Sequence, residues 1–340
     1  MVAGTRGEVN IGALNYSMQA IDVTMPTLHT QSSLSHLYRW LLIALSGLLF
    51  AACNTAQKQP DVIALAITPP TPSIVKPPPK IALVLGGGGT RGFAHIGVIK
   101  TLEAQGIVPD IIVGTSVGSV VGALYARGYS GFELQELSMR MEEEDVIDKS
   151  WLNSKVKLLM GSFEGEALEK FINHNVHGYT IEKLKRKFAA VATDRDSGEM
   201  IVFSTGDTGV AVHASSAVPS VFKPVLINGH YYVDGGLVRP VPVSVARSLG
   251  ANFIIAVDIS NSPQNNKIEY RIEEPLQIFD IMSQTINRYE LPGADIVIRP
   301  DTSKIDQTNL TGRHEAVLQG EMAANAQLLA LKAKLKELQH

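Results

Sequence analysis

The sequence predicts an α/β fold in which a mostly parallel sheet lies between layers of helices. Short apolar, strand-like runs alternate with helix-like segments from Lys80 to about Pro300, a pattern typical of parallel sheets. The length of 340 residues, of which 45% are hydrophobic, suffices to bury a sizeable core. We therefore expect one domain over residues 80–340, preceded by segments of a different character.

Residues 1–52 form an N-terminal extension that ends like a signal peptide. An apolar stretch of 13 residues occupies positions 40–52 and follows Arg39. It is shorter than the roughly 20 residues that span a bilayer, but it has the length of a signal-peptide hydrophobic region. The residues further upstream have no targeting character, so we expect translation to start at Met18 or Met25.

The apolar stretch ends in Phe50-Ala51-Ala52-Cys53, and Cys53 is the only cysteine of the chain. This resembles the lipobox of bacterial lipoproteins, in which small residues precede the cysteine that is lipidated. Phe50 departs from the usual leucine, and a buried cysteine without a special role is the alternative. The resemblance implies a lipid anchor on the cell envelope. The absence of aspartate at position 54 implies the outer membrane, with the protein facing the periplasm.

Residues 53–79 are polar and proline-rich and end in Pro77-Pro78-Pro79. Such a segment favours an extended tether, with a reach of at most about 80 Å as polyproline II. An anchor at Cys53 would thus hold the following domain at a membrane surface.

A glycine-rich loop follows the first strand of the domain. Lys80 to Leu85 is expected to form a buried parallel strand, residues 86–92 read GGGGTRG, and Phe93 to Gln105 is expected to form a helix. Consecutive glycines let backbone N–H groups converge on one anionic oxygen. Such a loop serves either as an oxyanion hole or as a cradle for a dinucleotide pyrophosphate.

The dinucleotide interpretation depends on an acidic residue at the end of the second strand. Gly87, Gly89 and Gly92 match the GxGxxG pattern of dinucleotide sites. Asp110 has about the expected spacing, but it stands at the start of that strand. The end of the strand is occupied by Gly114 to Gly118, which favours a hydrolase.

The segment Gly114-Thr115-Ser116-Val117-Gly118 matches GxSxG, the pattern of a nucleophile elbow. The strand-like run 111–113 precedes it, and a helix-like segment of small residues over 119–127 follows. A strand that turns sharply into a helix exposes the serine and directs the helix dipole at its oxygen. A plain Gly/Ser turn is the alternative.

Asp234 follows an aromatic run in Tyr231-Tyr232-Val233-Asp234-Gly235-Gly236. Asp-Gly after such a run is a common hairpin turn. The functional interpretation makes Asp234 the base that takes the proton from Ser116. Beside an elbow and a glycine loop, we favour the base.

From about Lys80 to Asp258 the chain resembles the patatin-like phospholipases, in particular the bacterial branch similar to neuropathy-target-esterase catalytic domains. Five blocks carry the resemblance in the order of that family. They are GGGTRG at 87–92, GTSVG at 114–118, ATD at 192–194, ASSAVP at 214–219 with FKP at 222–224, and DGGLVRPVP at 234–242.

The resemblance implies a patatin-like α/β/α fold and a lipid acyl hydrolase of phospholipase A or lysophospholipase type, without a cofactor. The family uses a Ser–Asp dyad, so Ser116 is implied as the nucleophile and Asp234 as the base. The implied oxyanion hole consists of Gly87, Gly88 and Gly89. The residues that are expected to support the site are Arg91, Gly92, Gly114, Gly118 and Gly235.

Chemistry alone supports the same mechanism. A serine hydroxyl needs an adjacent base, and a carboxylate of ordinary pKa is a poor match for that proton. Such a dyad must therefore obtain much of its rate enhancement from stabilisation of the oxyanion. In an α/β-hydrolase triad a histidine follows the acid, but only His314 and His340 follow Asp234. We expect His314 to start a helix and His95 to support the glycine loop.

We also expect specific roles for several other residues and segments. Arg91 anchors either a phosphate or its own loop, Asp194 belongs to the fold around the site, and 196–198 form a turn. The segment 133–177 is expected to form helices over the mouth of the site. Residues 320–338 are expected to form a helix that packs on the domain, with contact to a membrane as the alternative.

The composition of the chain limits the classes of partner that we expect. The net charge is −3 and basic runs are short, which makes nucleic acid an unexpected partner. No His/Cys cluster has the spacing of metal ligands, so no metal is expected. The expected partners are a phospholipid or lysophospholipid substrate and a membrane surface. A non-catalytic lipoprotein that keeps the fold as a binding module is a further alternative.

Overall fold

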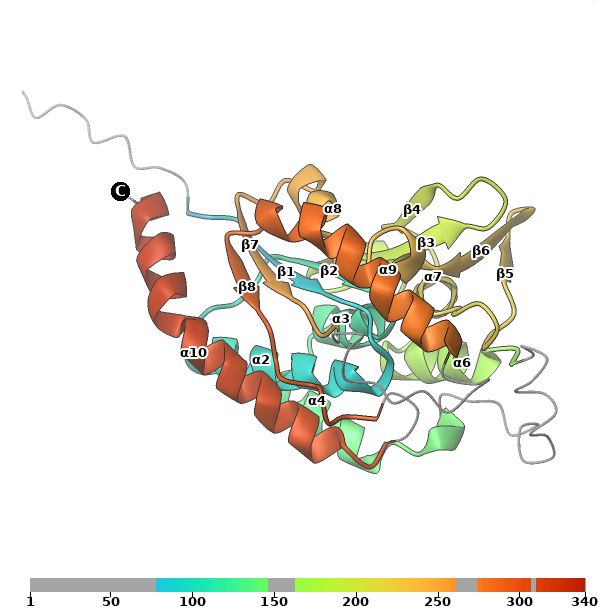
Figure 1. Cartoon of the computed structure of the whole chain (residues 1–340), viewed down its shortest axis with the longest axis horizontal. Coiled ribbons are helices and arrows are strands. Elements are labelled where there is room, and N and C mark those ends of the chain that lie inside the picture. The colour runs from blue at the N-terminus through green and yellow to red at the C-terminus, as the bar shows by residue number, and fades with distance from the viewer. Residues whose placement is uncertain (1–77, 146–162, 261–273, 307–309, 340) are drawn as a thin grey trace, which may run out of the picture. The chain divides into compact units, whose positions relative to one another are not determined.

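The computed structural model of the chain describes residues 78–145, 163–260, 274–306 and 310–339 (Figure 1). The signal peptide, Cys53 and nearly all of the tether lie outside these residues. The division of the chain at residues 52 and 79 and the lipid anchor therefore stay predictions.

Eight strands of the described residues form one sheet in the order β5-β6-β3-β2-β1-β7-β8, with β4 paired to β3. The five strands from β3 to β8 in this order run parallel, whereas β4 and β6 pair antiparallel with β3, and β5 with β6. The prediction of a mostly parallel sheet is confirmed. The strands are β1 Ile81–Leu85, β2 Ile111–Thr115, β3 Lys187–Asp194, β4 Met200–Phe203, β5 Val225–Ile227, β6 His230–Asp234, β7 Phe253–Val257 and β8 Ile296–Ile298.

Side chains alternate along the central strands, so each strand contributes to two cores. In β1, Leu83 and Leu85 pack with the layer that contains α2, α3, α4 and α10, whereas Ala82 and Val84 pack with α8. Because both faces are covered, these strands read as unbroken apolar runs. The helices are α2 Phe93–Ala104, α3 Val117–Arg127, α4 Gly131–Arg140, α6 Glu166–Asn175, α7 Thr208–Ser215, α8 Val243–Ser248, α9 Glu274–Glu290 and α10 Arg313–Gln339.

The turn that the sequence predicts at 196–198 joins β3 to β4. Asp194 Oδ1 accepts the backbone N–H groups of Asp196 and Ser197 at 3.0 and 2.9 Å. The hydrogen bond from the Ser197 backbone is the main cause that lowers the pKa of Asp194. Asp194 thus stabilises the fold beside the site, as expected.

The C-terminal helix α10 is longer than the predicted 320–338. It packs along α2, and a Cβ atom built on Gly320 would lie 2.0 Å from the carbonyl oxygen of Ala94. Leu331 is fully buried, whereas Leu329 is 85% exposed and contributes nothing to this packing. Among the described residues, no helix has the length and apolarity required to cross a bilayer.

Candidate functional site

The candidate residues come together where neighbouring strands end. The glycine loop follows β1, Ser116 follows β2, and Asp234 is the last residue of β6. Strands β2 and β6 pair with opposite edges of β3. The sheet therefore places Ser116 and Asp234 on either side of β3.

Ser116 lies in the sharp turn that the sequence predicts. Its φ and ψ are 54° and −130°, and it is the N-cap of α3. A non-glycine residue held in such a conformation stores strain of about 1–3 kcal/mol, as functional sites often do. Cβ atoms built on Gly114 and Gly118 would lie 2.3 and 2.1 Å from the carbonyl oxygens of Gly118 and Leu85. The turn therefore requires both glycines and holds Ser116 at the positive end of α3.

Ser215 holds the elbow from the side, and sequence reasoning assigned it no role. Its Oγ accepts the backbone N–H of Ser116 at 3.0 Å and donates to the carbonyl oxygen of Val191 at 2.6 Å. Ser215 lies in the ASSAVP block, which marks it as a candidate. Its contact with Ser116 spans 99 residues and leaves no local sequence signal.

Asp234 is buried, with 1% of its surface exposed. Its Oδ1 accepts the backbone N–H of Gly236 at 2.6 Å. The hairpin alternative for this residue is wrong, because Asn228 and Gly229 form the tight turn between β5 and β6. Burial raises the pKa of Asp234 from 3.8 to about 6, against the opposing effects of hydrogen bonding to Ser116 and Gly236.

The side chains of Ser116 and Asp234 approach each other without a fully formed hydrogen bond. The Ser116 hydroxyl lies near enough to lower the pKa of Asp234, yet Oδ2 of Asp234 has no partner of regular hydrogen-bond geometry. Catalytic hydrogen bonds are often loose in a free enzyme and shorten when substrate binds. The arrangement thus leaves one oxygen of a buried carboxylate available to receive a proton from Ser116.

The glycine loop passes directly beside Ser116. A Cβ atom built on Gly87 would lie 3.3 Å from the Cβ of Ser116. The N–H of Gly87 donates to the carbonyl oxygen of Pro240 at 3.0 Å and is therefore already engaged. Within the described residues, no such partner engages the N–H of Gly88 or Gly89. These two groups, rather than all three glycines, are available to an oxyanion.

Arg91 anchors the glycine loop from inside the protein. It is 2% exposed, its Nε donates to the carbonyl oxygen of Gly88 at 3.0 Å, and Nη2 pairs with Asp280 of α9 at 2.9 Å. In a trans peptide the C=O of Gly88 and the N–H of Gly89 point in opposite directions. Arg91 therefore orients the Gly89 N–H, and its burial favours the loop-anchoring alternative over a phosphate contact.

The remaining glycines that the resemblance implies are sites of close packing. Cβ atoms built on Gly92 and Gly235 would lie 2.2 Å from Val117 and 2.1 Å from the carbonyl oxygen of Val191. Both positions exclude a side chain, so the loop stays against the elbow and the Asp234 segment stays against β3.

His95 is fully buried below the glycine loop. Its Nε2 lies 2.8 Å from the carbonyl oxygen of Gly86, which can only accept, so this nitrogen carries the proton. Burial lowers the pKa of His95 from 6.5 to about 4, so the ring is neutral at pH 7. His95 supports the loop, as expected, and His314 lies exposed at the start of α10.

Replacing His95 by alanine is expected to lower stability by about 1–3 kcal/mol, because the Gly86 carbonyl oxygen loses a partner in the core. The chemical step should fall less than about tenfold, since the ring serves the loop and not proton transfer. Urea unfolding and ester kinetics measure the two effects, with His314→Ala as the exposed control. If either variant lost the chemical step with an unchanged circular dichroism spectrum, the assignment of a Ser–Asp dyad without histidine would be wrong.

The structure also places the residues of the dinucleotide alternative. Asp110 Oδ2 accepts the N–H of Ile81 at 2.8 Å, so its carboxylate is engaged where β1 and β2 begin. The glycine loop follows the other end of β1. Asp110 therefore cannot serve as the ribose acceptor of that pattern, and the hydrolase interpretation is favoured again.

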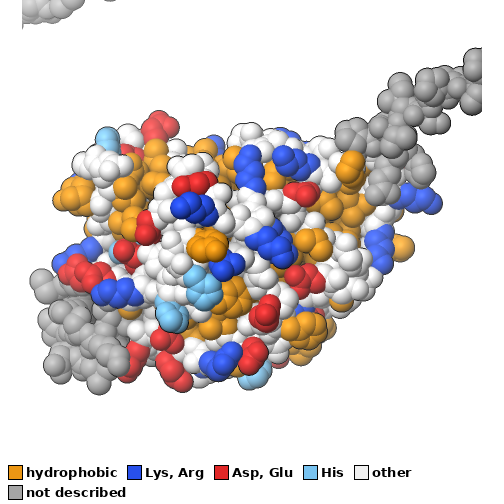
Figure 2. Space-filling model, turned by 180° about the vertical axis from the view of Figure 1, so that it is seen from behind, with side chains coloured by type: hydrophobic (Ala, Val, Ile, Leu, Met, Phe, Trp, Pro, Cys, Tyr) orange, Lys and Arg blue, Asp and Glu red, His pale blue; other side chains and the backbone are white. Residues whose placement is uncertain are grey.

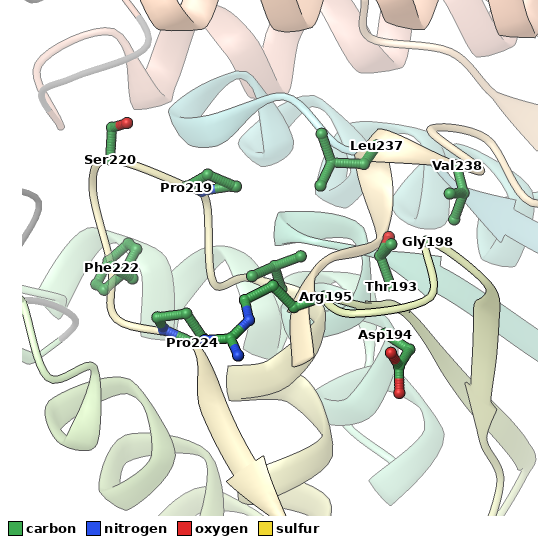
Figure 3. Close-up of a pocket in the computed structure, with 11 residues that line it drawn as sticks. Thr193, Asp194, Arg195, Gly198, Pro219, Ser220, Phe222, Pro224, Leu237 and Val238 are labelled. Carbon is green, nitrogen blue, oxygen red and sulfur yellow. The ribbon is translucent and has the colours of Figure 1, made fainter. Parts of the chain in front are cut away.

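A hollow of about 640 Å³ lies on the Asp234 side of the site (Figure 3). Ser116 and the glycine loop do not line it, but Val233 and Leu237 on either side of Asp234 do. Its wall is mainly apolar and includes Pro219, Phe222 and Pro224. Of the segment 133–177, α4 and α6 are helical as expected, while residues 146–162 lie outside the described residues.

Comparison with known proteins identifies the family. Residues 83–247 match the family model described as patatin-like phospholipase. Patatin-like phospholipase domain-containing protein 6 of Homo sapiens is 33% identical over 233 residues, which cover 66% of this chain and 16% of that protein. An uncharacterized NTE family protein of Mycobacterium bovis is 33% identical over 191 residues, 54% of this chain and 50% of that protein. This chain thus spans half or less of the length of these relatives.

Among solved structures, VipD from Legionella pneumophila has a TM-score of 0.49 and 15% identity, and the match covers 74% of this chain and 66% of VipD. The residues matched by the family model include the glycine loop, the elbow and Asp234. Residues 83–247 therefore form a domain of the patatin-like phospholipase family.

Proposed function

We propose that the chain is a lipid acyl hydrolase that works through an acyl-enzyme on Ser116, with Asp234 as the base. The observation that carries this is the pairing of a strained, helix-capping serine with a buried aspartate that has one free oxygen. The family match supports a lipid ester as the substrate, either a phospholipid or a lysophospholipid.

The first half of the cycle transfers the acyl group to the enzyme. Asp234 takes the proton of Ser116 as Oγ attacks the ester carbonyl carbon. The N–H groups of Gly88 and Gly89 stabilise the oxyanion, and one such donor contributes about 3–4 kcal/mol in other acyl transferases. Asp234 then protonates the leaving alcohol, and the C–O bond of the ester breaks.

The second half returns the enzyme to its starting state. Water attacks the acyl-Ser116 ester and gives its proton to Asp234, and the fatty acid leaves as the serine regains that proton. A pKa near 6 serves both halves, because Asp234 must accept and return a proton near neutral pH.

The test is hydrolysis by the full-length chain of p-nitrophenyl esters of increasing chain length, of a phospholipid and of a lysophospholipid. Release of fatty acid is the expected result, and the preferred chain length would define the acyl pocket. A folded protein that is inert on every ester would refute the proposal and leave the lipid-binding module. Binding of a nicotinamide cofactor would instead favour the dinucleotide alternative.

Substituting Arg91 by lysine is expected to reduce kcat by about tenfold or more, with a smaller change in KM. Lysine keeps a positive charge for Asp280 but lacks the planar Nε that holds the Gly88 carbonyl oxygen. Oxyanion donors act in the transition state, so their misalignment appears in kcat. Steady-state kinetics on a soluble ester measure the split, and an unchanged kcat would contradict the anchoring role.

We further propose that acylation at Cys53 anchors the protein to the outer membrane, facing the periplasm, while the tether lets the domain reach lipid. The support is the lipobox-like sequence before the only cysteine. Cys53→Ala is expected to move the protein from the membrane fraction to the soluble fraction. Unchanged membrane fractionation would refute the anchor without bearing on the catalytic residues.

A further inference from the structure

Helix α9 exposes apolar side chains and buries polar ones, the reverse of an ordinary surface helix. Ile278, Ile281 and Tyr289 are 51%, 47% and 84% exposed. On the opposite side of the helix, Asp280 and Asn287 are only 4% and 3% exposed. The spacing of the exposed residues follows the helical repeat, so they form one outward apolar face.

Polar partners hold α9 in this orientation. Asp280 forms its ion pair with Arg91 of the glycine loop, and Asn287 Nδ2 lies 3.5 Å from Oδ1 of Asp258, which follows β7. Rotating the helix to bury its isoleucines would leave the Arg91 and Asp280 charges without each other, and breaking a buried ion pair is strongly destabilising. The exposed apolar face is therefore a fixed feature of the fold.

Two consecutive residues of α9 contact the two halves of the candidate site. Asp280 reaches the glycine loop through Arg91. Phe279 lies against Gly236, where a built Cβ atom would be 3.2 Å from its ring. The N–H of Gly236 donates to Asp234. Helix α9 thus packs against both halves of the site through its inner side, while its apolar face points outward from the same helix.

The chemistry of this face fits a lipid surface. The apolar face is followed at the C-terminal end of α9 by the exposed residues Arg288 and Tyr289. Apolar side chains flanked by tyrosine and arginine are typical of helices that lie in a membrane interface. Figure 1 shows α9 in front of the sheet on the near side. The opposite side, seen in Figure 2, carries Lys, Arg, Asp and Glu side chains interspersed with apolar ones.

We propose that the outward face of α9, defined by Ile278, Ile281, Met282 and Tyr289, docks on a phospholipid bilayer and brings the site to its substrate. This inference rests on the proposed function, because a lipid hydrolase must meet its substrate in a bilayer. The packing of α9 against both halves of the site favours a bilayer, which holds the substrate, over a second copy of the chain or a protein partner.

The test measures binding to vesicles of phosphatidylethanolamine and phosphatidylglycerol. All proteins are full-length and carry Cys53→Ala and Ser116→Ala, so that neither an anchor nor hydrolysis contributes. Ile278→Ser with Ile281→Ser is expected to weaken binding about tenfold, the scale for two partly inserted isoleucines. The matched control is Leu318→Ser with Met322→Ser on α10, which are 47% and 56% exposed and should bind as the parent protein does.

A loss that is equal in both double variants, or absent from both, overturns the proposal. A change of oligomeric state in the α9 variant without a loss of vesicle binding also overturns it and identifies a second copy as the occupant. If the first α9 pair disturbs folding, Met282→Ser with Tyr289→Ser tests the same face further from the ion pair.

Hydrolysis separates this inference from the proposed function. With Ser116 restored, the α9 variant should lose about tenfold in the ratio of vesicle hydrolysis to soluble-ester hydrolysis, in line with its weaker binding. A chain that binds vesicles through α9 but hydrolyses no ester would refute the proposed function and leave the docking surface standing. If the α9 variant hydrolysed vesicles and the soluble ester in the same ratio as the wild type, the docking surface would be refuted and the proposed function would stand.

Discussion

Ser116→Ala is expected to lower kcat/KM for every ester by about 10³-fold or more, because no acyl-enzyme can form without the hydroxyl. The fold should persist, since alanine keeps the Cβ and the backbone. Alanine does not relieve the backbone strain at this position, because only glycine lacks the Cβ atom that causes it. The free energy of unfolding should therefore stay within about 1 kcal/mol of the wild-type value. Ester kinetics, circular dichroism and labelling with a serine-reactive fluorophosphonate measure these effects.

Ser119→Ala is the matched control for the loss of a hydroxyl from the elbow. Ser119 Oγ donates to the carbonyl oxygen of Ser116 at 2.6 Å, but that oxygen also accepts the backbone N–H groups of Ser119 and Val120. The elbow therefore keeps its hydrogen bonding and should keep its activity. Equal losses in the two variants would show that Ser116 serves the turn rather than the chemistry.

Asp234→Asn is expected to reduce kcat/KM by a similar factor of about 10³, because an amide cannot take the proton of Ser116. Asparagine keeps the shape and an oxygen for the N–H of Gly236. In the wild type, activity should rise with pH through about 6, where Asp234 loses its proton. A kcat/KM profile from pH 4.5 to 8 tests this, and a wild-type profile without an acid limb would contradict Asp234 as the base.

The same substitution is expected to stabilise the fold at pH 8. Because burial raises the pKa of Asp234 from 3.8 to about 6, the folded state holds its proton in a window where the unfolded chain has lost it. The stability that this provides is fully present below pH 3.8 and is lost as the pH rises through about 6. The loss is on the order of 3 kcal/mol.

Asp234→Asn carries no buried charge and escapes that loss. Thermal unfolding should give the variant a higher Tm than the wild type at pH 8 and a smaller advantage at pH 5. A lower Tm at pH 8 would mean that the carboxylate is well solvated or paired, and the raised pKa would then be wrong. Lost activity with gained stability is the pattern of a residue kept for function.

Much of the site follows from local sequence. GxSxG between a β-branched run and a run of small residues predicts the elbow, because its strained turn needs neighbours without side chains on either side of Ser116. The glycine loop is predicted in the same way from four consecutive glycines after an apolar strand. The helix after each loop also follows from residues within a few positions of it.

Other features depended on residues far apart in the chain. The sequence predicts three oxyanion glycines, but the N–H of Gly87 is engaged by Pro240, 153 positions away. The hairpin and base interpretations of Asp234 could be separated only when the tight turn was found at Asn228 and Gly229. No periodicity or spacing encodes such partners.

The sequence by itself determined the class of fold, the elbow, the loop and the family, because strand and helix patterns and turns are set by neighbouring residues. The tertiary structure alone decided which loop N–H groups stay free, what Arg91 anchors and which face of α9 is exposed. Arg91 and Asp280 lie 189 positions apart, and their pairing depends on how the chain packs. Burial, which sets both that ion pair and the pKa of Asp234, exists only once the layers have assembled.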